Sequence, residues 1–87
     1  MKKFIASIQI MPHDALLDPQ GKAVTAAMKN IGLPDVAAVR VGKNITCEIS
    51  APDDSSARQM VTLACERLLC NQIMERFEFH VAEVKDL

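Results

Sequence analysis

Apolar and polar residues alternate through the first dozen positions of the chain. Within residues 3–11, one face carries only apolar side chains, namely Phe4, Ala6, Ile8 and Ile10. A period of two is typical of a β-strand that buries one of its faces. The pattern therefore predicts a half-buried strand that Pro12 ends. A strand of the same kind is predicted from about Glu75 to Val84, where one face carries Phe77, Phe79 and Val81.

Two longer stretches repeat apolar residues at helical spacing instead. The first helix is expected from Pro19 to about Asn30, with Asp18 as its N-cap and Gly32 just past its end. Its apolar stripe consists of Ala23, Val24, Ala27, Met28 and Ile31. The second helix begins after Pro52 and Asp53 and has the strongest periodicity in the chain, through Ala57, Met60, Val61, Ala64, Cys65, Leu68 and Leu69. Both stripes are expected to be buried.

Gly21 falls in the first turn of the first predicted helix, where glycine costs roughly 0.5–1 kcal/mol relative to alanine. Two explanations are open. In the first, the missing Cβ leaves the free N–H groups of that turn accessible to the backbone or a carboxylate of a partner. In the second, Gly21 relieves packing against the sheet.

The residues between the two helices predict a β-hairpin. Val36 to Gly42 and Ile45 to Ala51 are rich in β-branched residues and flank the sequence Gly-Lys-Asn. The element order is then β-α-β-β-α-β over a single domain, residues 1–87. This order predicts an α+β fold, a two-layer sandwich in which a four-stranded antiparallel sheet carries both helices on one face.

The opposite face of that sheet would be mostly polar. It would carry Ser7, Gln9, Arg40, Thr46, Glu48, Glu78 and His80, interrupted by Ile5 and Met11. Such a face is too polar for a second core and suits a wet, self-complementary interface between subunits.

Composition narrows the possible partners. Ten Lys and Arg against eleven Asp and Glu give a net charge of −1, and Trp and Tyr are absent. Nucleic-acid binding usually requires a basic face with aromatic platforms, so no nucleic acid is expected. The three cysteines form no CxxC pair, which favours reduced thiols in the cytoplasm. No segment is long enough to span a bilayer, so no membrane is expected.

Side chains that could perform chemistry are scattered. His13 and His80 lack a third ligand at a recognised metal-site spacing, and Asp53 and Asp54 are better explained as helix caps. Small acylphosphatases share this size and strand order, but the segment after the first strand lacks their arginine and most of their glycines. We therefore expect no catalytic residue, no metal and no cofactor in this chain.

Four stretches together resemble a known family. They are LDPQGKAV (17–24), VRVGKNI (39–45), CERLLCN (65–71) and IMERFEF (73–79). Their order and spacing resemble the small subunit of phosphoribosylformylglycinamidine synthase, in the multi-subunit form of that enzyme. The resemblance implies a non-catalytic subunit of an ATP-dependent ligase complex of purine biosynthesis. It implies that the chain bridges a synthetase large subunit and a glutaminase subunit, and forms a homodimer or homotetramer.

The resemblance also gives Gly21 a function. Asp18, Pro19, Gln20 and Gly21 are expected to form a docking edge for a partner, and Arg40 and Lys43 to be charged anchors for a partner or for a second copy. An alternative is a regulatory domain of ferredoxin-like build that senses a small molecule such as an amino acid.

Overall fold

The chain forms an antiparallel sheet of three strands. A computed structural model describes residues 1–85, with β1 spanning Lys2–Pro12, β2 Lys43–Ala51 and β3 Glu75–Val84. The strand order is β2-β1-β3, so β1 is central and the other two are edge strands. The register places Ile8 of β1 between Ile45 of β2 and Phe79 of β3. The first and last strands predicted from the sequence are confirmed.

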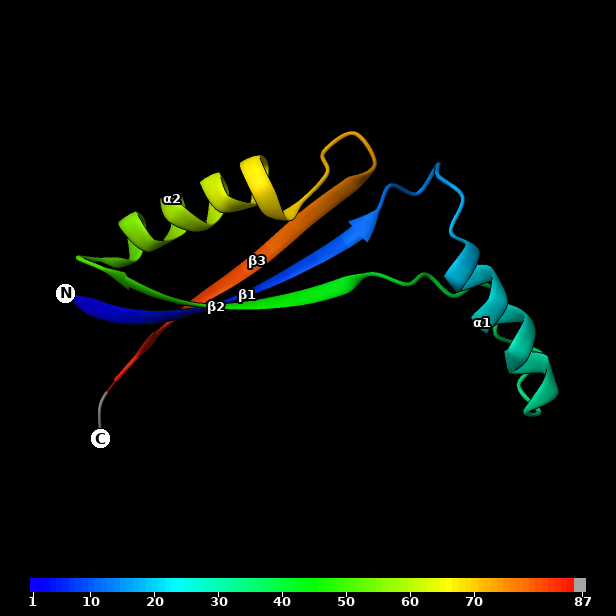
Figure 1. Cartoon of the computed structure of the whole chain (residues 1–87). Helices are drawn as coiled ribbons and strands as arrows, with labels where there is room; N and C mark the ends of the chain where they lie inside the picture. Colours follow the sequence, from blue (N-terminus) through cyan, green and yellow to red (C-terminus); the bar gives the residue numbers. More distant parts are fainter. Residues whose placement is uncertain (86–87) are drawn as a thin grey trace.

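One helix covers one face of this sheet (Figure 1). It is α2, which spans Asp54–Ala64 and is capped by the Asp53 carboxylate, which accepts from the Ser56 N–H at 2.8 Å. A π-helical turn, Cys65–Leu69, continues it, and the Cys70 N–H donates to the Cys65 carbonyl. The core between α2 and the sheet contains Phe4, Ala6, Ile8, Ile10, Ala51, Ala57, Val61, Cys65, Cys70 and Val81. Other members of the predicted stripe, such as Leu68, stay exposed.

The predicted hairpin is wrong, and the sheet has three strands rather than four. Residues 36–42 form no strand and run beside the other helix, α1, which spans Pro19–Asn30 (Figure 1). A tight turn at residues 42–44 would place Gly42 or Asn44 in the left-handed region. Within residues 1–85, however, the only residue with positive φ is Gly32, at 85°. The chain therefore passes from residue 42 into β2 without reversing.

The predicted packing of both helices on one face is also wrong. α1 lies beyond one end of the sheet, joined to it by the loop from 13 to 18 on one side and by residues 31–42 on the other (Figure 1). We call residues 13–42 the arm. The radius of gyration is 16.9 Å, against about 12 Å for a compact domain of this length. Residues 1–85 leave most of the apolar stripe of α1 uncovered: Val24 is 37 % exposed and Ile31 69 %.

The sheet face opposite α2 is open, as the alternation predicts. Ser7 lies on it between Thr46 and His80, and Gln9 lies between Asn44 and Glu78. Arg40 was expected on this face but lies in the arm instead, because residues 36–42 do not join the sheet. A subunit interface on this face stays a prediction.

Candidate functional site

The residues singled out from the sequence meet where the arm joins the sheet. Asp18 is the centre of this junction and is only 8 % exposed. One carboxylate oxygen accepts from the Gly21 N–H at 3.0 Å, which caps α1, and the other accepts from the Val41 N–H at 2.8 Å. These bonds, first that from Val41 and then that from Gly21, with Arg40 nearby, hold the pKa of Asp18 below its usual value. Asp18 therefore fastens residues 39–41 to the start of α1.

Gly21 is explained by the same contact. It is buried, and a Cβ on it would lie 2.2 Å from the Val39 carbonyl oxygen and 2.5 Å from an Asp18 carboxylate oxygen. The segment that approaches Gly21 closely is thus residue 39 of the same chain, not the sheet. The Gly21 N–H is not open to a partner either, because it donates to Asp18. The expectation that the missing Cβ leaves this turn accessible to a partner is wrong for Gly21.

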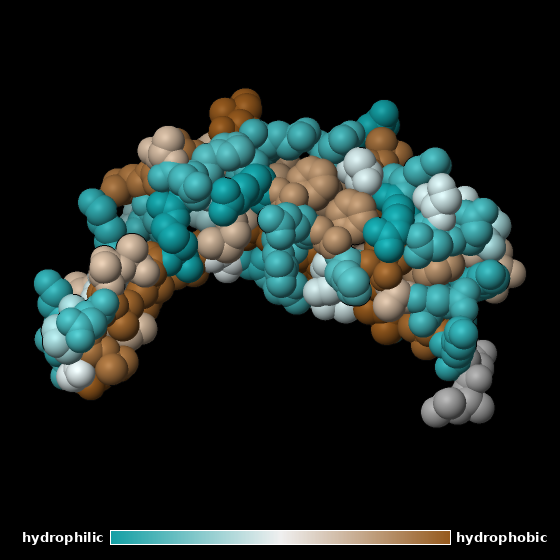
Figure 2. All heavy atoms as spheres, turned by 180° about the vertical axis from the view of Figure 1, so that it is seen from behind, coloured by the Kyte–Doolittle hydropathy of each residue, from teal (hydrophilic) through white to brown (hydrophobic). Residues whose placement is uncertain are grey.

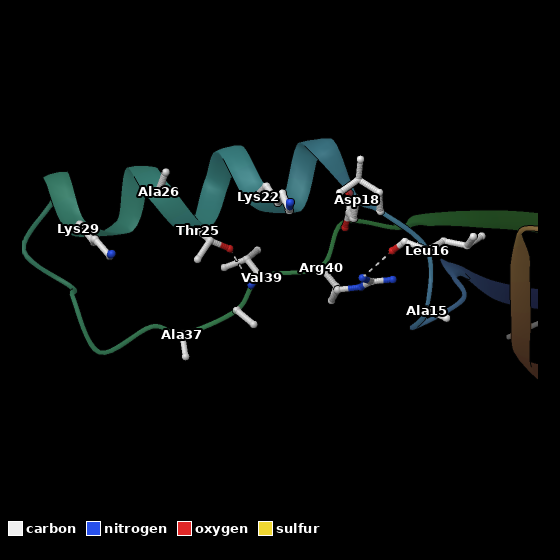
Figure 3. Close-up of a pocket in the computed structure, with 12 residues that line it drawn as sticks. Ala15, Leu16, Asp18, Lys22, Thr25, Ala26, Lys29, Ala37, Val39 and Arg40 are labelled. Carbon is white, nitrogen blue, oxygen red and sulfur yellow. Dashed lines mark hydrogen bonds between the residues drawn. The ribbon is translucent and has the colours of Figure 1, made fainter.

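Thr25 is a structural residue that the sequence analysis missed. Its hydroxyl donates to the Gly21 carbonyl at 2.7 Å. It also accepts from the Val39 N–H at 2.9 Å (Figure 3). A threonine in a helix can bond back to the carbonyl four residues before it. Its second bond, to a segment 14 residues away, left no local signal in the sequence.

Arg40 closes the junction from the other side. Its guanidinium donates to the carbonyls of His13 at 2.8 Å and Pro12 at 3.3 Å. It also donates to the Leu16 carbonyl at 3.3 Å (Figure 3). A planar guanidinium can serve several acceptors at once, which the single ammonium of lysine does less well. Arg40 therefore fixes the loop after β1. Its predicted function as an anchor for a partner stays a prediction.

The remaining predicted residues surround one hollow. Pro19, Gln20 and Lys43 line it together with Asp18, over a volume of about 380 Å³. Pro19 and Gln20 are exposed, and the Lys43 ammonium lies 3.8 Å from the Glu75 carboxylate. The structure thus brings together four of the six residues, while Gly21 is buried below them and Arg40 lines a second hollow on the arm.

Side chains that could perform chemistry form no metal-binding cluster in the described part of the chain. Among residues 1–85, no three His, Cys, Asp or Glu side chains lie close enough to hold a metal ion. The three cysteines are free thiols, and burial raises the pKa of Cys65 and Cys70. These two thiols are therefore protonated at neutral pH, which makes them poor nucleophiles. Within the same residues, neither helix is long and apolar enough to cross a membrane.

Comparisons with known proteins agree on one family. The family model PurS, described as phosphoribosylformylglycinamidine (FGAM) synthase, matches residues 5–83. The FGAM synthase subunit PurS of Bacillus subtilis is 35 % identical over 77 residues, which is 88 % of this chain and 90 % of that protein.

Solved structures share this fold over almost the whole chain. PurS of Thermus thermophilus matches with a TM-score of 0.87 and 31 % identity, over 95 % of this chain and 99 % of that one. A chain in the structure of PurLQS from Thermotoga maritima matches with a TM-score of 0.82 and 33 % identity, over 97 % of this chain and 100 % of that one.

Proposed function

The chain belongs to the PurS family of FGAM synthase, and from this membership we propose how it works as the small subunit of that enzyme in purine biosynthesis. The observation that carries the proposal is the match to a chain of the PurLQS structure over 97 % of this sequence. We propose that the chain supplies no reacting group. It bridges the synthetase and glutaminase subunits, which convert formylglycinamide ribonucleotide to its amidine with glutamine and ATP.

The amino-acid sensor considered from the sequence is not favoured, because the matches are to FGAM synthase subunits. We also propose that the chain associates with itself, since most of the apolar stripe of α1 is exposed among the described residues. A cytoplasmic location agrees with the three free thiols.

The junction hollow is the proposed docking site for one of the larger subunits. Its exposed rim consists of Pro19, Gln20 and Lys43, and its floor includes the Asp18 carboxylate. Because Asp18 and Arg40 form hydrogen bonds within the chain, they hold the rim in place. The rim is therefore rigid before binding, which lowers the ordering cost of association.

Assembly can be measured by light scattering on the purified chain mixed with the synthetase and glutaminase subunits. We expect one particle that contains all three, and three separate species would contradict the bridging proposal. Gln20→Arg should weaken that assembly, because it adds bulk and charge at the rim without touching a buried group. Asn30→Arg, at the far end of the same helix, is the matched control. Equal behaviour of the two variants would overturn docking at the hollow.

A further inference from the structure

A groove runs along the arm between α1 and residues 37–40 (Figure 3). We call it the arm groove. It has a volume of about 710 Å³, and the loop before α1 lines one of its ends. Ala26, Ala37 and Ala38 also line it, and all three are exposed. Because their side chains are only methyl groups, the arm groove admits the close approach of another backbone.

The arm groove carries positive charge. Lys22 and Lys29 line it from the side of α1 (Figure 3), and both are exposed. Within residues 1–85, neither lysine forms an ion pair. Arg40 adds a third positive charge at one end. The one acidic side chain in the lining, Asp18, is buried and accepts two backbone hydrogen bonds. The arm groove is therefore basic, although the chain has a net charge of −1.

The arm groove and the apolar stripe of α1 lie on opposite sides of this helix. Each helical residue turns the direction of its side chain by about 100°, so Val24 points about 200° away from Lys22. Met28 and Ile31 share the side of Val24. Figure 2 shows the same division on the arm as a whole, with apolar atoms turned inward toward the arch and hydrophilic atoms outside. A cover on the stripe therefore leaves the arm groove open.

The spacing of the two lysines indicates what the arm groove binds. Lys22 and Lys29 are seven residues apart, which is two helical turns or roughly 10.5 Å along the axis. A single phosphate favours donors that converge on one point. Two ammonium groups at this separation instead match two carboxylates at positions i and i+7 of an opposing helix.

The arm groove is continuous with the junction hollow. Leu17 and Asp18 line both of them. Leu17 is 67 % exposed, so a large apolar side chain stands in solvent between the two. An exposed apolar side chain that basic groups flank is typical of the anchor of a protein interface. A subunit that covers the junction hollow thus reaches the arm groove through Leu17.

We propose that the arm groove binds an acidic helix of the larger subunit that docks at the junction hollow. The helix places its apolar side on Leu17 and the three alanines, and two of its carboxylates, two turns apart, pair with Lys22 and Lys29. This inference rests on the proposed docking at the junction hollow and names the chemistry of the partner. Charges at the edge of an interface mainly increase the rate of association and make it depend on salt.

Carbodiimide crosslinking of the three mixed subunits tests the pairing directly. The reagent joins an ammonium group to a carboxylate in contact with it as an amide, and takes up the water that is released. We expect Lys22 and Lys29 to be linked to two acidic residues of one larger subunit, about seven positions apart, when the digest is analysed by mass spectrometry. Lys3, which is also exposed and forms no ion pair within residues 1–85, should not link to that helix. Links from Lys22 and Lys29 only to other copies of this chain, or no links, would overturn the proposal.

Charge reversal gives the energetic test. Lys22→Glu and Lys29→Glu should each raise the Kd about tenfold when the chain is titrated into a mixture of both larger subunits in a calorimeter. Both variants should also show a weaker dependence of Kd on salt. Lys3→Glu, with the same change of charge, is the matched control. The reversal in the first turn of α1 favours the helix dipole and that in the last turn opposes it, so a loss of binding in both does not reflect helix stability.

The results separate this inference from the proposed function. Reversals that bind as Lys3→Glu does, while Gln20→Arg binds less tightly, would overturn the arm groove and leave docking at the junction hollow. An altered mass of the isolated reversal variants by light scattering would assign the arm groove to contacts between copies and overturn the proposal. So would a rise in Tm with inorganic phosphate alone that both reversals abolish. Failure of the unaltered chain to bind either subunit would contradict the bridging function itself.

Discussion

Replacing Gly21 by alanine tests the attachment of the arm segment to α1. The new methyl group would lie 2.2 Å from the Val39 carbonyl oxygen, whereas ordinary contact begins at 3.4 Å. Residues 39–41 must therefore retreat by 1.2 Å, the difference of those two distances. A shift of that size breaks the 2.9 Å bond from the Val39 N–H to Thr25.

Three contributions set the expected change in the free energy of unfolding. Overpacking a tight site costs about 1–3 kcal/mol. The lost hydrogen bond adds about 0.5–1.5 kcal/mol. Alanine in a helix interior stabilises the helix by about 1 kcal/mol relative to glycine, which offsets part of this loss. The free energy of unfolding should therefore fall by about 0.5–3.5 kcal/mol, and each kcal/mol lowers Tm by about 4–8 °C for a domain of this length.

The assay is urea unfolding at one fixed protomer concentration, because self-association makes apparent stability depend on concentration. Thr25→Val completes a double-mutant cycle with Gly21→Ala. If both substitutions act through Val39, the loss in the free energy of unfolding for the double variant should be smaller than the sum of the two single losses. If the first turn of α1 were open, as expected from the sequence, Gly21→Ala would raise the free energy of unfolding instead of lowering it. A gain of about 1 kcal/mol in Gly21→Ala would refute the packing of Val39 on this helix.

Three further predictions concern the side chains of Arg40, Asp18 and the two buried cysteines. Arg40→Lys should speed proteolytic cleavage within residues 13–16, because the compact ammonium of lysine reaches the three separate carbonyls less well than the planar guanidinium; unchanged cleavage would contradict this. The pKa of Asp18 is lowered in the folded chain, so its stabilising contribution is present above the usual value of 3.8 and is lost as pH falls through the folded value. An NMR titration with a midpoint at or above 3.8 for Asp18 would refute this. Cys65 and Cys70 should resist alkylation at neutral pH until the chain unfolds, and rapid labelling of either would contradict their burial.

Local chemistry was enough to predict most elements. Asp18 and Pro19 mark the start of α1, the Asp53 cap marks the start of α2, and alternation places Phe4 and Ile8 in the core. These signals lie within a few residues of the feature that they specify. The π-helical turn after Ala64 has no such signal, because its i to i+5 bond differs little in sequence from a continuing α-helix.

The position of the arm could not be predicted in the same way. The valines of residues 36–42 have the composition of a strand, and the stripe of α1 has the period of a buried helix. Both patterns indicate that a surface will be covered, but neither says by which chain. The same limit applies to the candidate site, since Asp18 was predicted as a cap while its bond to Val41, 23 residues away, arises only from the fold.

The central claim is that this chain contributes surfaces rather than reacting groups to FGAM synthesis. The most direct measurement is the rate of glutamine-dependent amidine formation by fixed amounts of the synthetase and glutaminase subunits, with and without the chain. We expect turnover only when the chain is present, and no glutamine hydrolysis by the chain alone. An equal rate without it, or glutaminase activity in the isolated chain, would contradict the account.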